Sequence, residues 1–221
     1  MKFRHEYKHR INSLDLMLLR KRLEAVMERD SFALEDGSYY IKSLYFDNYT
    51  DKALREKVDG VNRREKFRIR YYNNDTSFIR LEKKSKINNF CLKESTAITL
   101  KQCQQIIDGD IDFLIKSNQP LFNELYAKMQ YQLLRPKCIV AYDRESFVCR
   151  QGNTRVTLDT DIRGSYDVKS FLSPDTSMTQ LYHTSILEVK WDEYLPEIVN
   201  DAVRLKSRRT SSFSKYAAVR F

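Results

Sequence analysis

Long apolar runs, paired cysteine motifs and low-complexity segments are all missing from this 221-residue chain. No run approaches the roughly 18 apolar residues that a membrane-spanning helix needs, so any membrane association would have to come through a partner protein. The cysteines form no Cys-x-x-Cys pair and no secretory signal precedes them, which predicts reduced thiols in a cytoplasmic protein. They are Cys91, Cys103, Cys138 and Cys149.

Internal repeats and Pro-rich linkers are also missing, and acidic residues are outnumbered. A chain of this length without linkers is most simply one domain, which we expect to cover residues 1–221. Hydrophobic residues make up 42% of the chain, which favours a globular fold over disorder. Lys and Arg number 39 against 30 Asp and Glu, a net charge of +9 that favours an anionic partner. That balance alone does not distinguish nucleic acid, a phosphate ligand and a membrane surface.

Charged and apolar residues alternate most clearly in a predicted β-hairpin near residue 70. Its first strand is Arg64–Tyr72, its second runs from Phe78 to Lys84, and Asn73-Asn74-Asp75 is a typical turn. One face of each strand is charged and the opposite face is mainly apolar. The charged face carries Arg64, Lys66, Arg68 and Arg70 on the first strand, and Arg80, Glu82 and Lys84 on the second.

The same alternation returns in predicted strands at both ends of the chain. A single strand of this kind is explained by a sheet whose charged face meets water. Recurrence on several strands instead favours a sheet that closes with its charged faces inward, around a polyanion. We therefore predict an α+β fold: an antiparallel closed β-barrel with helices packed outside and a C-terminal helix near the tunnel. The recurring residues are Arg4, Glu6 and Lys8, then Arg155, Thr157 and Asp159, then Glu188 and Lys190.

Capping signals predict where the helices begin. Asn12 or Ser13 starts a helix to about Arg29, and Thr50 caps a short helix through Lys57. Thr99 and Gln102 form a capping box for a helix that ends by Gly109. Further helices are predicted within 111–133, from Pro196 to about Leu205, and after Ser211 or Ser212, and Gly164–Thr184 is predicted as a surface loop.

His5-Glu6-Tyr7-Lys8-His9 has the letters of the HExxH zinc motif. That motif works on a helix, where the two histidines share one face. Here the alternation predicts a strand, and the neighbouring cations would oppose a divalent metal. We therefore interpret the match as coincidence.

Cations that face one another inside a barrel repel unless an anion or water intervenes. A phosphate chain suits such a site, because Arg binds its oxygens bidentately and Lys supplies point charge. Mg²⁺ or Mn²⁺ could bind there too, since hard cations take oxygen ligands from protein and phosphate together. RNA binding is disfavoured, because the aromatic residues fall on the opposite, apolar faces. The candidate metal ligands are Glu6, Glu82, Asp159 and Glu188.

Eight segments give the chain a resemblance to the VTC domain, the polyphosphate-polymerase branch of the triphosphate tunnel metalloenzymes. They are RHEYKHRI, SLYFDN, REKFRIRYY, IRLEKKSK, AYDRESFV, RVTLDTDIR, ILEVKWDEYLPE and SSFSKY, in the family's order over nearly the entire chain. The resemblance implies a tunnel barrel that binds triphosphate or polyphosphate with a divalent metal. The chain resembles a free-standing bacterial version of the domain, without the inositol-phosphate-sensing domain and membrane helices of the eukaryotic complex.

The resemblance implies transfer of the terminal phosphoryl group of ATP to a growing polyphosphate chain. Arg4 stands where the wider superfamily has the first glutamate of Glu-x-Glu-x-Lys, which favours the polymerase branch. The alternatives are a tunnel triphosphatase and a non-catalytic module that binds polyphosphate or nucleic acid. Together with the alternation of charged residues, the resemblance implies that Glu188 is the main metal ligand. The catalytic residues that it implies are Arg68, Arg70, Arg144, Arg155 and Lys215. Phosphate binding is assigned to Lys8, Arg64, Lys66, Arg80, Lys84, Lys93, Lys190 and Ser214.

Overall fold

The computed structural model describes residues 4–31, 33–34, 37–87, 90–181, 184–205 and 213–220. The chain divides into two compact units, which interleave in sequence. Unit 1 comprises Met1–Tyr40, Tyr142–Arg163 and Gln180–Ser214. Unit 2 comprises Ile41–Ala141, Gly164–Thr179 and Lys215–Phe221.

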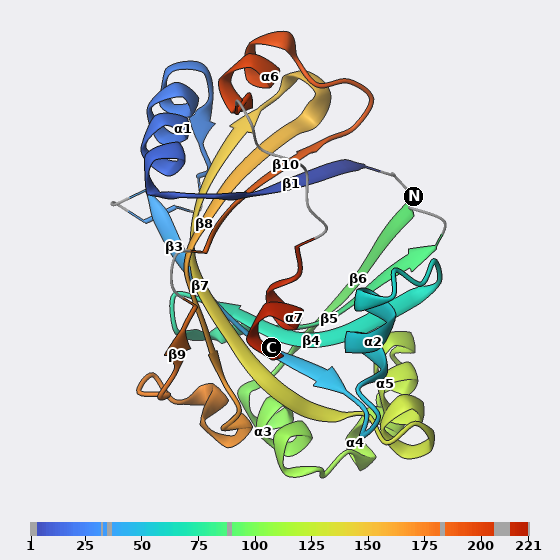
Figure 1. Ribbon diagram of the computed structural model, residues 1–221. Coiled ribbons are helices and arrows are strands. Elements are labelled where there is room, and N and C mark those ends of the chain that lie inside the picture. The colour runs from blue at the N-terminus through green and yellow to red at the C-terminus, as the bar shows by residue number, and fades with distance from the viewer. Residues whose placement is uncertain are drawn as a thin grey trace. The chain divides into compact units, whose positions relative to one another are not determined.

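The strands pair in the order β1-β10-β8-β7-β3-β4-β5-β6, with β2 on β7 and β9 on β8 (Figure 1). All the registers recorded between neighbouring strands are antiparallel, which confirms the predicted antiparallel α+β fold. The strands are β1 (His5–Ile11), β2 (Glu28–Arg29), β3 (Ser38–Asp47), β4 (Arg64–Tyr72), β5 (Asp75–Ile87), β6 (Phe90–Ile98), β7 (Arg135–Cys149), β8 (Thr154–Ser165), β9 (Thr179–Gln180) and β10 (Ser185–Trp191).

The prediction of a closed barrel is wrong. Within the described residues, the strand order is an open path that begins at β1 and ends at β6, and these two strands do not pair. Alternation determines which face of a strand each side chain occupies. Closure depends instead on tilt and stagger summed over the whole sheet, which no local pattern specifies.

The predicted hairpin of unit 2 is confirmed, with a longer second strand. β4 and β5 flank a two-residue turn, since Tyr72 pairs with Asp75. Asn73 and Asn74 both have positive φ, 51° and 55°, as the tightest antiparallel hairpin turns require. Asparagine tolerates this region better than most residues, which explains why the sequence signal located the turn.

The core of unit 2 lies on the apolar face of the hairpin. Phe67, Ile69 and Tyr71 of β4 are buried in one cluster with side chains of the central helices, such as Ile106 and Leu125. The helices of unit 2 are α2 (Lys52–Val58), α3 (Leu100–Asp108), α4 (Asp112–Lys116), α5 (Pro120–Tyr131) and α7 (Lys215–Arg220). The central helices therefore form a packing layer over the apolar face of the hairpin.

Two helix ends test the predicted caps in unit 2. At α3, Thr99 and Gln102 form the predicted capping box, and Gly109 ends the helix with φ of 87°. At α2 the predicted Thr50 cap is wrong, because Asp51 occupies the cap position without a side-chain capping bond. The Asp47 carboxylate instead accepts hydrogen bonds from the backbone N–H groups of residues 53 and 54, at 2.9 and 3.1 Å.

Unit 1 packs two helices beside its strands. α1 (Ser13–Val26) and α6 (Glu197–Val203) lie side by side (Figure 1), and Leu19 and Leu23 share a buried cluster with Val199. Of the two predicted caps, Asn12 caps α1, and it forms a capping box with Asp15. The helix ends at Val26 rather than near Arg29, because the chain there pairs with β7 as strand β2.

The predicted loop after Gly164 is more ordered than its composition indicates. It contains a short 3₁₀ helix, Val168–Leu172, whose Phe171 is fully buried in the unit 2 core, and the two-residue strand β9. The predicted caps Ser211 and Ser212 lie outside the described residues. Among the helices that the structure describes, none is long and apolar enough to cross a membrane.

Candidate functional site

The charged face of unit 2 consists of rows of side chains that run across the strands. In the arginine row, Ser43, Arg70 and Arg80 occupy directly opposite positions on β3, β4 and β5. In the mixed row, Tyr45, Arg68, Glu82 and Ser95 occupy such positions on β3 to β6. In the lysine row, Lys66, Lys84 and Lys93 occupy directly opposite positions on β4, β5 and β6. Next to this row, Arg64 of β4 lies opposite Lys86 of β5.

Like charges directly opposite one another on a sheet destabilise it. Three pairs of this kind are found between β4 and β5: Arg64 with Lys86, Lys66 with Lys84, and Arg70 with Arg80. The three rows and the Arg64–Lys86 pair together contain one carboxylate, Glu82, against eight cations. The face therefore has a large local excess of positive charge that a polyanion would neutralise.

Glu82 is the centre of the mixed row. Arg68 Nη2 lies 2.6 Å from one carboxylate oxygen, and Lys93 Nζ lies 2.5 Å from the other. Burial raises the pKa of Glu82, but Arg68, Arg70 and Lys93 outweigh burial and lower the pKa to about 2. Glu82 thus holds Arg68 and Lys93 in place. Its predicted role as a metal ligand stays a prediction.

Tyr45 is a site residue that the sequence analysis missed. Its side chain is buried, and its hydroxyl accepts a hydrogen bond of 3.1 Å from Arg68 Nη1. Burial alone would raise the pKa of the phenol, but Arg68, Lys66 and Arg70 together lower the pKa to about 7. Tyr45 and Ser43 are two residues apart on β3 and so share one face, but no local sequence pattern shows that this face meets Arg68 and Arg70.

The two arginines of the arginine row are each held by a serine. Arg70 donates from Nε to Ser43 Oγ at 3.0 Å, and Arg80 donates from Nε to Ser95 Oγ at 2.6 Å. Arg80 Nη2 also lies 3.4 Å from the Ser95 carbonyl oxygen. Arg70, predicted as catalytic, and Arg80, predicted to bind phosphate, therefore both have a fixed orientation.

The C-terminal helix α7 packs against the mixed row of unit 2. The Tyr216 and Tyr45 rings lie 5.2 Å apart, and the Tyr216 hydroxyl donates to Asp47 at 2.5 Å. Arg220 ties the other end of the helix to Asp51 at 2.8 Å. Lys215, a predicted catalytic residue, is the first residue of this helix. The structure thereby brings α7 to the charged face of its unit.

The charged face of unit 1 has a more even balance of charge. Lys8 lies opposite Glu188, and Glu6 lies opposite Lys190. Lys8 Nζ is 2.6 Å from Glu6 and 3.8 Å from Glu188, while Lys190 contacts the same two carboxylates. Burial lowers the pKa of Lys8, but Glu188 and Glu6 outweigh it and raise the pKa above the usual lysine range. These four residues form one alternating ion cluster.

Two predicted catalytic arginines lie on the same face. Arg144 makes a bidentate ion pair with buried Asp159, with Nε and Nη2 at 2.5 and 2.7 Å. Its Nη2 is also 3.8 Å from Glu188, so Arg144 joins Asp159 to the ion cluster. Arg155 donates from Nε to Ser146 Oγ at 2.9 Å and contacts Asp30. Unit 1 therefore brings Arg144, Asp159 and Glu188 together.

The residues of unit 1 offer oxygen ligands to a divalent metal, although they do not form a complete cage. In the part of the chain that the structure describes, no three His, Cys, Asp or Glu side chains gather in a metal-binding group. Glu6 and Glu188 lie together, and Thr157 faces Glu188 across the strands. The Thr157 hydroxyl is buried and has no hydrogen-bond partner among these residues. Such a donor set fits a hard cation that takes its other ligands from phosphate oxygens.

The HExxH letters lie on strand β1, where residues four apart cannot share a metal as they do on a helix. His5 stacks on Trp191 with ring centroids 5.3 Å apart, and His9 meets the edge of Tyr7. The two histidines therefore pack against aromatic rings in unit 1.

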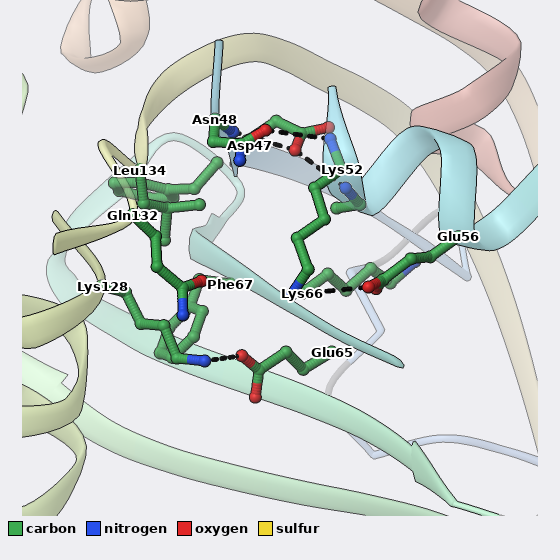
Figure 2. A pocket seen from close by; sticks show the side chains of 12 residues that line it. Asp47, Asn48, Lys52, Glu56, Glu65, Lys66, Phe67, Lys128, Gln132 and Leu134 are labelled. Carbon is green, nitrogen blue, oxygen red and sulfur yellow. Dashed lines mark hydrogen bonds and ion pairs between the residues drawn. The ribbon is translucent and has the colours of Figure 1, made fainter. Parts of the chain in front are cut away.

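A small polar pocket in unit 2 lies beside the lysine row. Figure 2 shows the side chains that line it, which include Lys52, Lys66 and Lys128 together with Glu56 and Glu65. Lys52 pairs with Glu56 at 3.4 Å, and Lys128 pairs with Glu65. Its volume of about 20 Å³ holds a water molecule or two. The pocket is too small and too evenly charged to bind a triphosphate.

The sequence-assigned strand residues of unit 2 thus lie on one face of its strands, and those of unit 1 lie on one face of theirs. Ser214 belongs to unit 1 and immediately precedes α7. The expectation that both faces line a single enclosed cavity concerns both units and stays a prediction. The sequence analysis missed four residues that contact the arginines of these faces: Ser43, Tyr45, Ser95 and Ser146. They carry no charge, so only their position on the same strand face as the arginines could have indicated them.

Comparison with solved structures shows the same fold in distant proteins. A candidate adenylate cyclase from Bacillus halodurans is 12% identical, with a TM-score of 0.50 over 91% of this chain and 86% of that one. The PH1012 protein from Pyrococcus horikoshii is 13% identical, with a TM-score of 0.52 over 99% of both chains. At this identity the likeness shows the fold alone.

Sequence comparison identifies the family. None of the curated proteins matches the chain. The sequence model of the VTC domain matches residues 3–220, which include every residue of both charged faces. Because this match spans almost the entire chain, the protein belongs to the VTC domain family.

Proposed function

We propose that this protein is a polyphosphate polymerase, which transfers the terminal phosphoryl group of ATP to a growing polyphosphate chain. The observation that carries the proposal is the charged face of unit 2, where cations directly face cations across the strands. Such a face costs stability unless it binds a chain of negative charges. Membership of the VTC family and the fold of its structural neighbours support an enzyme of the tunnel superfamily.

Phosphoryl transfer needs in-line positioning and neutralisation of charge more than it needs a strong protein base. We assign neutralisation of the transferring group to Arg68, Arg70, Arg144 and Arg155, each of which is oriented by a hydrogen bond from Nε or Nη. Phosphate binding falls to Lys8, Arg64, Lys66, Arg80, Lys84, Lys93, Lys190 and Ser214. Lys215 acts near the reacting phosphates, from the first turn of α7.

Glu188 and Glu6 would hold Mn²⁺ or Mg²⁺, with Thr157 as a further oxygen donor. A bound divalent ion would supply charge neutralisation at the phosphate oxygens. The protein's own contribution is to hold both carboxylates close together, because Lys8 and Lys190 each contact both of them.

Arg4 favours a polymerase over a triphosphatase. It takes the position of the first glutamate of the superfamily motif, and its Nε lies 3.0 Å from Asp192. The side chain therefore replaces a candidate metal ligand with a cation that is anchored in unit 1. A site with fewer carboxylates is less suited to activating water and more suited to holding phosphate.

The test is incubation of the purified protein with ATP and Mn²⁺, followed by a gel for polyphosphate and an assay for free phosphate. Polyphosphate formation with little free phosphate is the expected result. Free phosphate without polymer would show a tunnel triphosphatase, and tight polyphosphate binding without ATP turnover would show a binding module. Either of these outcomes overturns the polymerase proposal.

A further inference from the structure

We propose that Arg70 and Arg80 form a subsite for one terminal phosphoryl group, with Ser43 and Ser95 as its positioning residues. This inference rests on the proposed function and assigns part of the same face. On this inference the two rows have different roles. The arginine row recognises the shape of a phosphoryl group, and the lysine row attracts any part of the polyphosphate chain.

The first step is that the two arginines are neighbours. Arg70 and Arg80 lie directly opposite each other on β4 and β5. Directly opposite residues on one face of an antiparallel pair have Cβ atoms about 5 Å apart. Their side chains therefore leave the sheet side by side, and Arg70 is largely buried, with 6% of its surface exposed.

The second step is that serine holds each guanidinium at Nε. Ser43 is fully buried on β3 and Ser95 is on β6, so the two hydroxyls flank the arginine pair from the two neighbouring strands. The Nε bonds are 3.0 and 2.6 Å long. Because a guanidinium group is planar and rigid, one bond at Nε orients the whole fork. Serine thus preorganises two planar donors.

The third step is that serine orients arginine without adding a negative charge. Arg68 and Arg144 donate from Nε to the carboxylates of Glu82 and Asp159 instead. Arg155 in unit 1 also uses a serine, but it contacts Asp30 as well. No carboxylate lies directly opposite either arginine of this row, although the charge of Glu82 in the neighbouring mixed row also acts on Arg70.

The ligand that matches two oriented forks is a terminal phosphoryl group. A guanidinium group binds two phosphate oxygens at once, and two such groups require more than two acceptor oxygens. An internal phosphate of a linear chain has two non-bridging oxygens, whereas a terminal one has three and more charge. The lysine row, with Lys66, Lys84 and Lys93, supplies point charges that do not require such a shape. Chain ends and chain interiors are therefore recognised by different rows.

The experiment compares linear tripolyphosphate with cyclic trimetaphosphate, which has no terminal phosphoryl group, by calorimetry. In Ser95→Ala we expect the affinity for tripolyphosphate to fall about tenfold, because a hydrogen bond to a charged group is lost. The affinity for trimetaphosphate should change by less than about twofold. In Lys84→Ala both affinities should fall by a similar factor. Equal losses for the two ligands in Ser95→Ala would overturn the proposal.

A double-mutant cycle shows whether Ser95 acts through Arg80. Lysine cannot present a fork, so Ser95→Ala should cost no further affinity for tripolyphosphate in an Arg80→Lys protein. An equal cost in both backgrounds would contradict a positioning role. Ser95→Thr keeps the hydroxyl and should restore binding. Ser85→Ala removes a serine from the other face of β5 and serves as the matched control.

The results of these experiments distinguish a failure of the subsite from a failure of the proposed function. A wild-type protein that binds neither phosphate would remove the basis for both. A wild-type protein that makes polyphosphate, with Ser95→Ala and Ser43→Ala variants indistinguishable from it, would refute the subsite alone. Ser95 is half-buried, so its alanine variant should fold even if Ser43→Ala does not.

Discussion

Tyr45 shows how a single side chain can report on the charge around it. It carries the only acidic group of the mixed row besides Glu82, and it faces Arg68, Lys66 and Arg70 from β4 and Tyr216 from α7. The cations lower its pKa from 10.0 to about 7 despite burial. A bound phosphate would compete with the phenolate for the same cations.

The first prediction concerns the pH dependence of phosphate binding. Because the pKa of Tyr45 is depressed in the folded protein, ionisation stabilises the fold increasingly above pH 7, and this contribution is lost as pH falls through 7. Binding of tripolyphosphate should weaken from pH 7 to 9, since the phenolate must be neutralised first. Calorimetry at constant ionic strength should show this weakening in the wild type and much less of it in Tyr45→Phe. A tyrosine absorbance titration without a group near pH 7 would contradict the assignment.

Glu188 carries the second prediction. Glu188→Gln removes a charge that contacts Lys8, Lys190 and Arg144, yet Glu6 and Asp159 remain to pair with these cations. Stability and polyphosphate binding should therefore stay nearly unchanged. ATP turnover should fall at least about a hundredfold, because a metal contributes several kcal/mol at the transferring phosphate. Full turnover in the variant would show that the metal ligand is on another strand.

At the scale of elements, Asp47 connects two helices that are far apart in sequence. One carboxylate accepts hydrogen bonds from the first turn of α2 and from Tyr216 of α7. Burial, the hydrogen bond to Asp47 and its charge raise the pKa of Tyr216, so this hydroxyl stays a donor. The position of α7 therefore depends on the same carboxylate that accepts hydrogen bonds from the first turn of α2.

The third prediction tests this connection. Asp47→Ala leaves several buried donors without an acceptor, so the free energy of unfolding should fall by about 3 kcal/mol. Tyr216→Phe removes one donor and should cost about 1 kcal/mol. Thr99→Ala at the independent cap of α3 should also cost about 1 kcal/mol. Denaturant unfolding measures all three, and an Asp47→Ala loss no larger than that of Thr99→Ala would contradict the shared cap.

Particular elements show how far sequence alone could go. The turn at Asn73-Asn74 and the capping box of Thr99 and Gln102 were predictable, because a few adjacent residues determine each of them. The cap of α2 was not, since its acceptor, Asp47, belongs to the preceding strand. Ser43, Ser95 and Tyr45 became site residues only when strand register placed them beside arginines. The open sheet was missed for the same reason, because pairing between distant strands is not a local property.

At the scale of the whole molecule, the two charged faces have different compositions. The charged face of unit 2 has eight cations and one carboxylate in its rows and the Arg64–Lys86 pair, whereas in unit 1 Glu6, Asp159 and Glu188 alternate with cations. The metal chemistry that we propose therefore belongs to unit 1, and the main attraction for polyphosphate belongs to unit 2.

The fourth prediction follows from the uncompensated charge of unit 2. Tripolyphosphate at about 100 times its dissociation constant should stabilise the protein by roughly 2.7 kcal/mol. For a chain of this size that corresponds to a rise of about 5–10 °C in the melting temperature. Circular dichroism follows the whole chain, and the fluorescence of Trp191 follows unit 1. No rise in melting temperature, or a rise that salt does not reduce, would contradict an electrostatic site.

The lysine row has a consequence for how a product would leave. Lysine ammonium groups on flexible stems hold a polyanion without fixing its register, so a chain of identical repeats can advance by one repeat while keeping nearly the same number of ion contacts. Each advance then has a low barrier, whereas complete escape requires the loss of all contacts together. On the proposed function, a polymer would therefore undergo many additions in one binding event, and long chains would coexist with unextended primer.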